Sequence, residues 1–149
     1  MTALTISATT LGSAELLLLS LAADGLNNRE IAAATGTTAP MVQAAVSYLI
    51  NTLGVDSRAQ LVALAYRRGW LQRVPTRRTF ANLTERQLEI AQMLVDGDGQ
   101  QQIARALGIG SRSVYDHLER IFQRTGARNR PHLIRIVVDS GLATVRSEP

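Results

Sequence analysis

The chain carries the same pattern of apolar residues and glycines twice, at a constant spacing and without a gap. Ile31-Ala32 returns as Ile103-Ala104, so each residue has its counterpart 72 positions later (103 − 31). Self-similarity at a fixed period is the sequence signature of duplicated structural units. We therefore expect two small units of similar fold rather than one larger domain. Further pairs at this spacing are Gly36 and Gly108, Val42 and Val114, Gly54 and Gly126, Arg58 and Arg130, Leu61 and Leu133, and Gly69 and Gly141.

Each unit carries the start and stop signals of four helices. Asn27 with Glu30, and Thr84 with Gln87, have the spacing of a capping box, in which two side chains cap a helix start reciprocally. Glycines follow the apolar stripes where helices should end. The expected helices begin near Gly12, Asn27, Thr38 and Asp56 or Ser57 in the first unit, and near Thr84, Gln101, Ser111 and Asn129 in the second.

These signals predict an all-α fold of two tandem four-helix helix-turn-helix modules. The first module covers residues 1–71, of which residues 1–10 are expected to be frayed. A short basic linker, expected to be a simple tether, covers residues 72–82. The second module with a short tail covers residues 83–149. Units this small are marginal alone, so we expect packing between them or dimerisation.

Composition argues against several classes of function. The chain has no cysteine, which rules out disulfides and cysteine nucleophiles. No stretch is long and apolar enough to span a bilayer, and Leu16–Leu19 lacks the positive flank of a secretory signal. We therefore expect a cytoplasmic, nucleoid-associated protein without a membrane partner. His117 and His132 are too few for a metal site and no nucleophile motif appears, so we expect no enzyme activity, catalytic residue, metal or cofactor.

The balance of charge is modestly basic. All 16 basic side chains are arginines, and the net charge is +4. Arginine suits bidentate contacts to phosphate and guanine, although a codon bias toward arginine explains its use equally well. The first module sums to zero charge, and the arginines of the second barely outnumber its acids. This electrostatic footprint is weaker than that of a strong nucleic-acid binder.

Both modules resemble the LuxR-type (GerE-type) helix-turn-helix family. The resemblance implies a four-helix module whose third helix enters the major groove of DNA and whose fourth helix often makes a dimer contact. In the second module it rests on Leu83-Thr84-Glu85-Arg86-Gln87, Ser113-Val114, His117, Ile121, Gly126 and Arg130. In the first it rests on the segment 25–32 (Gly-Leu-Asn-Asn-Arg-Glu-Ile-Ala), Leu53-Gly54-Val55 and Arg58.

The resemblance places three residues of the second module's third helix at base edges: Tyr115, Asp116 and Glu119. A carboxylate can accept a hydrogen bond from cytosine N4 in the major groove. Two carboxylates also repel the DNA backbone, so an ordinary solvated helix face is an equal alternative. The residues expected at phosphates are Arg112, Ser113, Arg120 and Arg124, and the linker residues Arg77 and Arg78 are expected at the intervening backbone.

The first module keeps fewer of these features. Asn28 and Arg29 are candidate phosphate contacts, and Gln43 and Ser47 occupy the positions of base readers. Gln43 is able to pair with adenine. The third helix is uncharged, however, and Tyr48 offers a surface for another protein chain. We therefore favour degeneration or protein contact slightly over base reading for this module.

The sequence thus favours a DNA-binding transcriptional regulator that recognises double-stranded DNA mainly through the second module's third helix. If both third helices face the same side, they would meet successive major grooves about 34 Å apart. The alternative is a protein-interaction role, in which the fold holds RNA polymerase, a sigma factor or another transcription factor. A third arrangement combines both roles, with the second module on DNA and the first forming a homodimer.

Overall fold

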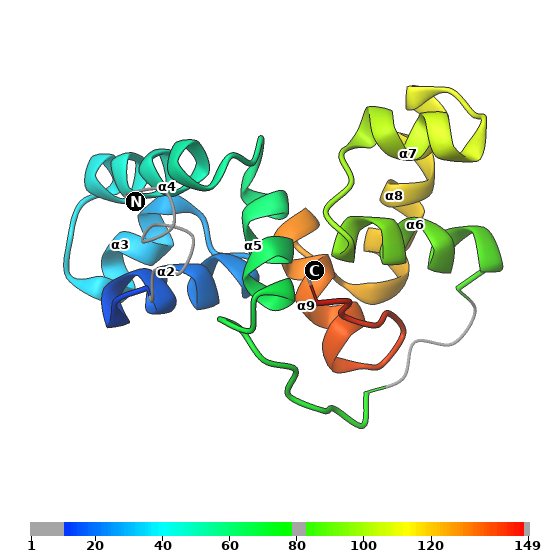
Figure 1. Cartoon of the computed structure of the whole chain (residues 1–149). Helices are drawn as coiled ribbons and strands as arrows, with labels where there is room; N and C mark the ends of the chain where they lie inside the picture. Colours follow the sequence, from blue (N-terminus) through cyan, green and yellow to red (C-terminus); the bar gives the residue numbers. More distant parts are fainter. Residues whose placement is uncertain (1–10, 79–82, 148–149) are drawn as a thin grey trace.

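A computed structural model describes residues 11–78 and 83–147 (Figure 1). These residues form eight α-helices and no strand, which confirms the all-α prediction. The predicted fraying of residues 1–10 lies outside the described residues. The helices are α2 (Ser13–Ala23), α3 (Asn28–Thr35), α4 (Ala39–Leu53), α5 (Arg58–Arg67), α6 (Glu85–Val95), α7 (Gln100–Leu107), α8 (Ser111–Thr125) and α9 (Arg130–Asp139).

Every helix of the N-terminal half (α2–α5) has a counterpart of equal length in the C-terminal half (α6–α9). Ser13 and Glu85 begin the first pair 72 residues apart (85 − 13), and the other three pairs keep this spacing at both ends. Glycines with positive φ angles follow corresponding helices in both halves. Such left-handed positions favour glycine because it has no Cβ atom. These pairs are Gly25 and Gly97, Gly36 and Gly108, Gly54 and Gly126, and Gly69 and Gly141.

The predicted capping boxes are present. The Asn27 side chain accepts from the Glu30 N–H, and the Glu30 side chain accepts from the Asn27 N–H, both at 2.9 Å. The Thr84 and Gln87 pair forms the same arrangement. Gly99 has no side chain to cap α7, but its own N–H donates to the Gln102 side chain at 2.6 Å. The helix therefore starts at Gln100, one residue before the predicted position.

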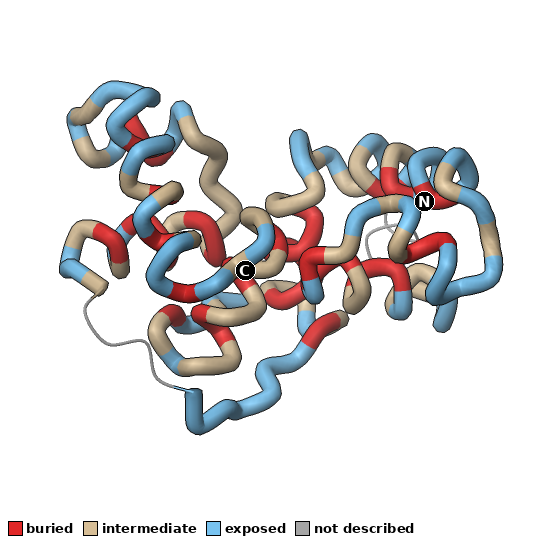
Figure 2. The backbone as a smooth tube through the Cα atoms, turned by 180° about the vertical axis from the view of Figure 1, so that it is seen from behind, coloured by how far each residue is buried: buried red, intermediate tan, exposed pale blue. Residues whose placement is uncertain are grey.

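Helices α5 and α9 join the two halves at the centre of the molecule (Figure 1). Helix α5 packs against α9 and α6, whereas α9 packs against α5 and α2. Each fourth helix therefore contacts the fourth and the first helix of the other half, which is the reciprocal pattern of an isologous interface. Six consecutive residues of α5, from Leu61 to Tyr66, are buried, and buried residues gather where the halves meet (Figure 2).

At two glycines in corresponding positions, Gly25 and Gly97, side chains of the other half approach the backbone closely. The Asn129 side chain donates to the Gly25 carbonyl at 3.0 Å, and the Gln60 side chain donates to the Gly97 carbonyl at 3.2 Å. A Cβ atom on Gly25 would lie 3.0 Å from the Cβ of His132. Glycine is therefore required there by the close approach as well as by its φ angle of +84°.

Arg135 on α9 makes the main polar contact between the halves. Its guanidinium pairs with the Asp24 carboxylate at 2.5 Å and donates to the Ser20 carbonyl and the Tyr66 hydroxyl, each at 3.0 Å. One side chain thus joins α9 to both α2 and α5. Nearby, Arg128 adds an ion pair with Glu30 at 2.8 Å.

The first part of the linker is hydrogen-bonded to α9. The prediction that the linker is a simple tether is therefore wrong for this part. The Arg73 Nε donates to the Val138 carbonyl at 2.9 Å, and the Thr76 N–H donates to the Asp139 carbonyl at 3.1 Å. Both carbonyls belong to the last turn of α9, where a helix leaves acceptors without partners. The linker therefore caps α9, although its residues 72–78 are exposed (Figure 2).

Replacing Arg135 by alanine should lower the free energy of unfolding by about 1–3 kcal/mol, because the partners in α2 and α5 lose a charged donor. Chemical denaturation measures this change. Arg146→Ala is the matched control, since Arg146 also forms an ion pair, with Asp96, but its side chain is 68% exposed against 19% for Arg135. Exposed pairs contribute little, so equal losses in both variants would contradict the proposed importance of Arg135.

Acidification should weaken the contact at His132. Burial lowers the pKa of His132, and its Nδ1 accepts a hydrogen bond from the Arg128 N–H at 3.0 Å. The neutral ring is therefore favoured in the folded protein. Its contribution is complete above the unfolded pKa of about 6.5 and is lost as the pH falls through the lower folded value. His132→Asn keeps an acceptor that does not titrate, so thermal unfolding of this variant should depend less on pH than that of the wild type.

Candidate nucleic-acid interface

Helices α7 and α8 form a helix-turn-helix pair at one end of the molecule (Figure 1). Gly108 ends α7 with a φ angle of +65°, and the turn continues to Gly110 before α8 begins. Val114, Leu118 and Ile121 lie one helical turn apart and are buried in the core. The opposite face of α8 is consequently presented to solvent.

The predicted α8 residues lie on this outward part of the helix. Tyr115 is 43% exposed although it is a large aromatic residue. Glu119 is half-buried, and the remaining members are exposed. We call this set the α8 face; it consists of Arg112, Ser113, Tyr115, Asp116, Glu119, Arg120 and Arg124.

Charges within the α8 face are paired with one another. The Arg112 Nε lies 3.3 Å from Asp116 Oδ1, and its guanidinium stands 5.4 Å from the centre of the Tyr115 ring. A hydrogen bond to the Glu119 carboxylate raises the pKa of Tyr115. Both carboxylates therefore have partners on α8 itself, which offsets part of the repulsion that they would exert on a phosphate.

Arg124 is anchored at the far end of the same face. Its Nη1 donates to the Gln87 side chain at 3.1 Å, and Gln87 is the residue that closes the capping box of α6. This contact fixes the end of α8 to the beginning of α6.

In each half, a half-buried arginine at the start of the fourth helix hydrogen-bonds to the start of the second helix, and sequence reasoning missed this role. Arg130 donates to the Gln100 side chain at 2.5 Å, and Gln100 donates in turn to Ser111 at the start of α8. In the N-terminal half, Arg58 donates to Asn28 at the corresponding positions. Burial lowers the pKa of both arginines. The recurrence of arginine at positions 58 and 130 was the sequence signal for this role. Their hydrogen-bond partners lie 30 residues away in sequence, so no local pattern indicates them.

The structure brings three predicted residues of the N-terminal half together, but it pairs them with each other. The Asn28 side chain donates to Gln43 at 2.8 Å, and Gln43 donates to Ser47 at 3.2 Å. The Gln43 amide therefore makes one hydrogen bond at each end, and its second N–H and second lone pair stay available. Arg29 is exposed beside this network.

The linker arginines lie away from the turn between α7 and α8. Residues 77 and 78 are exposed, and the linker runs on the lower side of the molecule in Figure 1, whereas α7 lies on the upper side. The Arg78 Nη2 approaches to 4.0 Å from the position that a Cβ on Gly126 would occupy, just after the end of α8. The linker cation is thus near the C-terminal end of α8.

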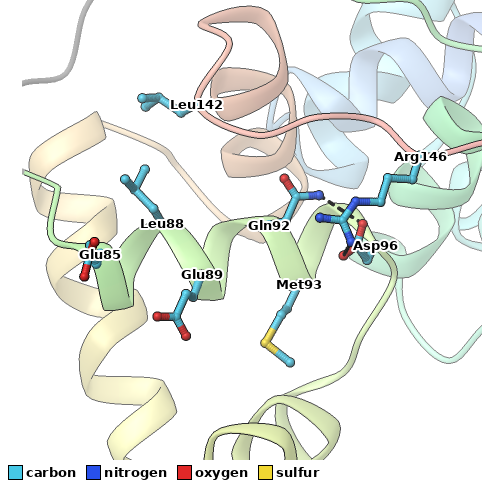
Figure 3. Close-up of a pocket in the computed structure, with 8 residues that line it drawn as sticks. All are labelled: Glu85, Leu88, Glu89, Gln92, Met93, Asp96, Leu142 and Arg146. Carbon is cyan, nitrogen blue, oxygen red and sulfur yellow. Dashed lines mark hydrogen bonds and ion pairs between the residues drawn. The ribbon is translucent and has the colours of Figure 1, made fainter.

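A separate hollow of about 590 Å³ lies along the outer side of α6 (Figure 3). Its acidic residues are Glu85, Glu89 and Asp96, and Arg146 pairs with Asp96 at 3.4 Å. The excess of carboxylates disfavours contact with phosphates on this side of α6. Among the described residues, no group of acids and histidines is arranged to hold a metal ion. Within the same residues, no helix is long and apolar enough to cross a membrane.

An exposed, arginine-bearing helix on a helix-turn-helix scaffold is the arrangement of a DNA-binding domain. Comparison with protein families agrees, because residues 81–137 match the luxR family of bacterial regulatory proteins (GerE). This part of the chain is similar to a family of bacterial regulatory proteins, which supports a DNA-binding regulator in general. The match does not extend to the N-terminal half. No curated protein and no solved structure matches the chain.

Glu119→Gln should lower the pKa of Tyr115, because it removes the carboxylate that accepts the hydrogen bond from the phenol and repels the phenolate. NMR titration of the tyrosine rings measures each residue separately. The signal of Tyr48, which lies at the other end of the molecule, serves as the internal reference. An unchanged Tyr115 titration would show that the two side chains do not pair in solution.

Proposed function

We propose that the protein is a transcriptional regulator that recognises double-stranded DNA mainly through the α8 face. The observation that carries this proposal is the division of α8 into a buried apolar side and an exposed side with three arginines and a tyrosine. This helix lies in the part of the chain that matches the luxR family. An exposed helix of this kind fits the major groove of B-DNA.

We assign the residues of the α8 face to two kinds of contact. Tyr115, Asp116 and Glu119 occupy the middle of the face and contact base edges. Arg112, with Ser113, Arg120 and Arg124, contacts phosphates. Arg112 exchanges Asp116 for a phosphate on binding, at small cost because an exposed ion pair is weak. That exchange leaves the Asp116 carboxylate able to accept a hydrogen bond from cytosine N4.

We propose further that the N-terminal half is a diverged second copy of the module, so that the protein is a tandem arrangement. The identical helix lengths and spacing and the four glycine pairs support this assignment. In this arrangement α5 takes the position of a partner's fourth helix, and one chain forms a dimer-like unit. Recognition is asymmetric, because the exposed side of α8 carries three arginines whereas α4 carries no charged residue. Asn28, Arg29, Arg77 and Arg78 then contribute backbone contacts only.

Alanine at both Arg112 and Arg124 should weaken binding to all DNA sequences and flatten its salt dependence. Each lost phosphate contact removes about 0.9 from the slope of log affinity against log salt, so the slope should fall by about 2. Fluorescence anisotropy with random duplexes across a salt series measures this slope. A variant with alanine at Arg68 and Arg146, which lie outside α8, removes the same charge and should keep the wild-type slope. Equal slopes in all three proteins would refute the docking on α8.

Asp116→Asn should change the base preference at one position of the bound site, because it replaces a pure acceptor by a group that also donates. The expected change in discrimination against other bases is about 1–3 kcal/mol. Selection of bound fragments from a random DNA pool measures the preference before and after the substitution. A preference that stays the same at every position would remove Asp116 from the base contacts.

The alternative is a protein-interaction role, in which the protein holds RNA polymerase, a sigma factor or another regulator. The acidic hollow on α6 favours it, because its carboxylates complement a basic protein surface (Figure 3). Chromatography on heparin separates the two roles. Retention that collapses between low and moderate salt supports DNA binding, and no retention at low salt supports the protein-interaction role.

A further inference from the structure

A hollow of about 500 Å³ lies between the two halves, at the starts of α3, α5 and α9. Helices α3 and α5 belong to the N-terminal half and α9 belongs to the C-terminal half, so neither half forms this hollow alone. Its volume falls within the usual range of pockets for small molecules. We call it the inter-half hollow.

The lining of the inter-half hollow is positive. It contains Arg58 and Arg130, and none of its other residues is charged. The Arg58 guanidinium donates to the Leu26 carbonyl at 3.4 Å and to the Asn28 side chain. Leu26 and Asn28 also line the hollow, so the charged end of Arg58 lies at its wall. Arg130 lines the hollow from the other half.

The charge of these arginines is not compensated by an acid. Among the described residues, neither Arg58 nor Arg130 forms an ion pair, and their hydrogen bonds go to uncharged acceptors. Both side chains are half-buried, and a charge removed from water is costly unless it has a counter-charge. They are also the first residues of α5 and α9, where the helix dipole disfavours a cation and favours an anion. An anion in the hollow would offset both costs.

The uncharged part of the lining indicates which kind of anion fits. Leu26, Ala59 and Pro131 contribute apolar surface, one from the start of each of the three helices. A phosphate or a carboxylate suits a guanidinium, which offers several N–H donors in one plane. Apolar walls suit an apolar body. The hollow therefore fits a small organic molecule with one charged end better than it fits an inorganic ion.

We propose that the inter-half hollow binds a small organic anion, a phosphate ester or a carboxylate, whose charged group contacts Arg58. This site is separate from the α8 face, but hydrogen bonds connect it to both third helices. Asn28, which accepts from Arg58, donates to Gln43 on α4 at 2.8 Å. Arg130 is connected to the start of α8 through Gln100. The ligand should therefore change the affinity for DNA, and only this last step rests on the proposed function.

Thermal unfolding and calorimetric titration of the full chain, without DNA and at constant ionic strength, test the binding. The probes are phenyl phosphate and benzoate, with benzyl alcohol as a neutral control of similar size. At least one anion should raise the unfolding midpoint saturably, because a ligand of the folded state stabilises it. No stabilisation by either anion, or equal stabilisation by benzyl alcohol, would overturn the proposal.

Ala59→Glu places a carboxylate in the hollow and tests the location of the site. Ala59 is the second residue of α5, where an acid is compatible with the helix start. The variant should be folded, as circular dichroism confirms, and its dissociation constant for the anion should rise at least about tenfold. Gln101→Glu is the matched control, since Gln101 is the second residue of α7 and does not line the hollow. It should keep the wild-type affinity. Wild-type affinity in Ala59→Glu, or equal losses in both variants, would overturn the location.

The DNA backbone is the other source of such an anion. Helix α5 ends toward the linker on the lower side of Figure 1, so it begins on the upper side, where α4 and α7 lie. Fluorescence anisotropy with duplex DNA separates the two sources. If neither free anion binds the wild type but Ala59→Glu weakens DNA binding more than Gln101→Glu does, the hollow holds a backbone phosphate and the proposal is overturned. If a free anion binds while no duplex does, the proposed function fails and the ligand site stands.

Discussion

The packing of α5 against α9 is the contact on which the rest of the structure depends. Four-helix units of this size are only marginally stable alone, and here each fourth helix packs against helices of both halves. Helix α5 is buried over Leu61–Tyr66 because it serves its own half on one side and α9 and α6 on the other. Arg135 and the close approach at Gly25 fix the geometry of this contact. The α3–α4 pair and the α7–α8 pair are thereby held at opposite ends of one core (Figure 1).

The sequence predicted the helices well because their ends are determined locally. Capping boxes at Asn27 and Thr84, and glycines after the helices, act within a few residues, so their spacing predicts their geometry. The contacts of Arg135 with Asp24 and Tyr66 join residues far apart in sequence, and no local pattern indicates them. The contacts of the linker could not be predicted from the sequence for the same reason. Its hydrogen bonds to α9 depend on where the last turn of α9 lies in space.

The candidate site was predictable in residue types but not in their partners. Helical spacing and the family resemblance were enough to select α8 and its outward positions. The pairing of Arg112 with Asp116, and of Tyr115 with Glu119, depends on side-chain rotamers. The same holds for Gln43. Its amide suits adenine by chemistry, and the structure adds hydrogen bonds with Asn28 and Ser47 that no sequence pattern indicates.

The two halves show how one backbone frame carries two different surfaces. The glycines and buried apolar residues that define the frame are shared, whereas the outward residues of the third helices differ completely. Tyr48 corresponds to Arg120, and Met41 corresponds to Ser113, so an apolar surface stands where the other half is polar and charged. Because most of these outward residues lie outside the core, each surface is able to change at little cost to the fold.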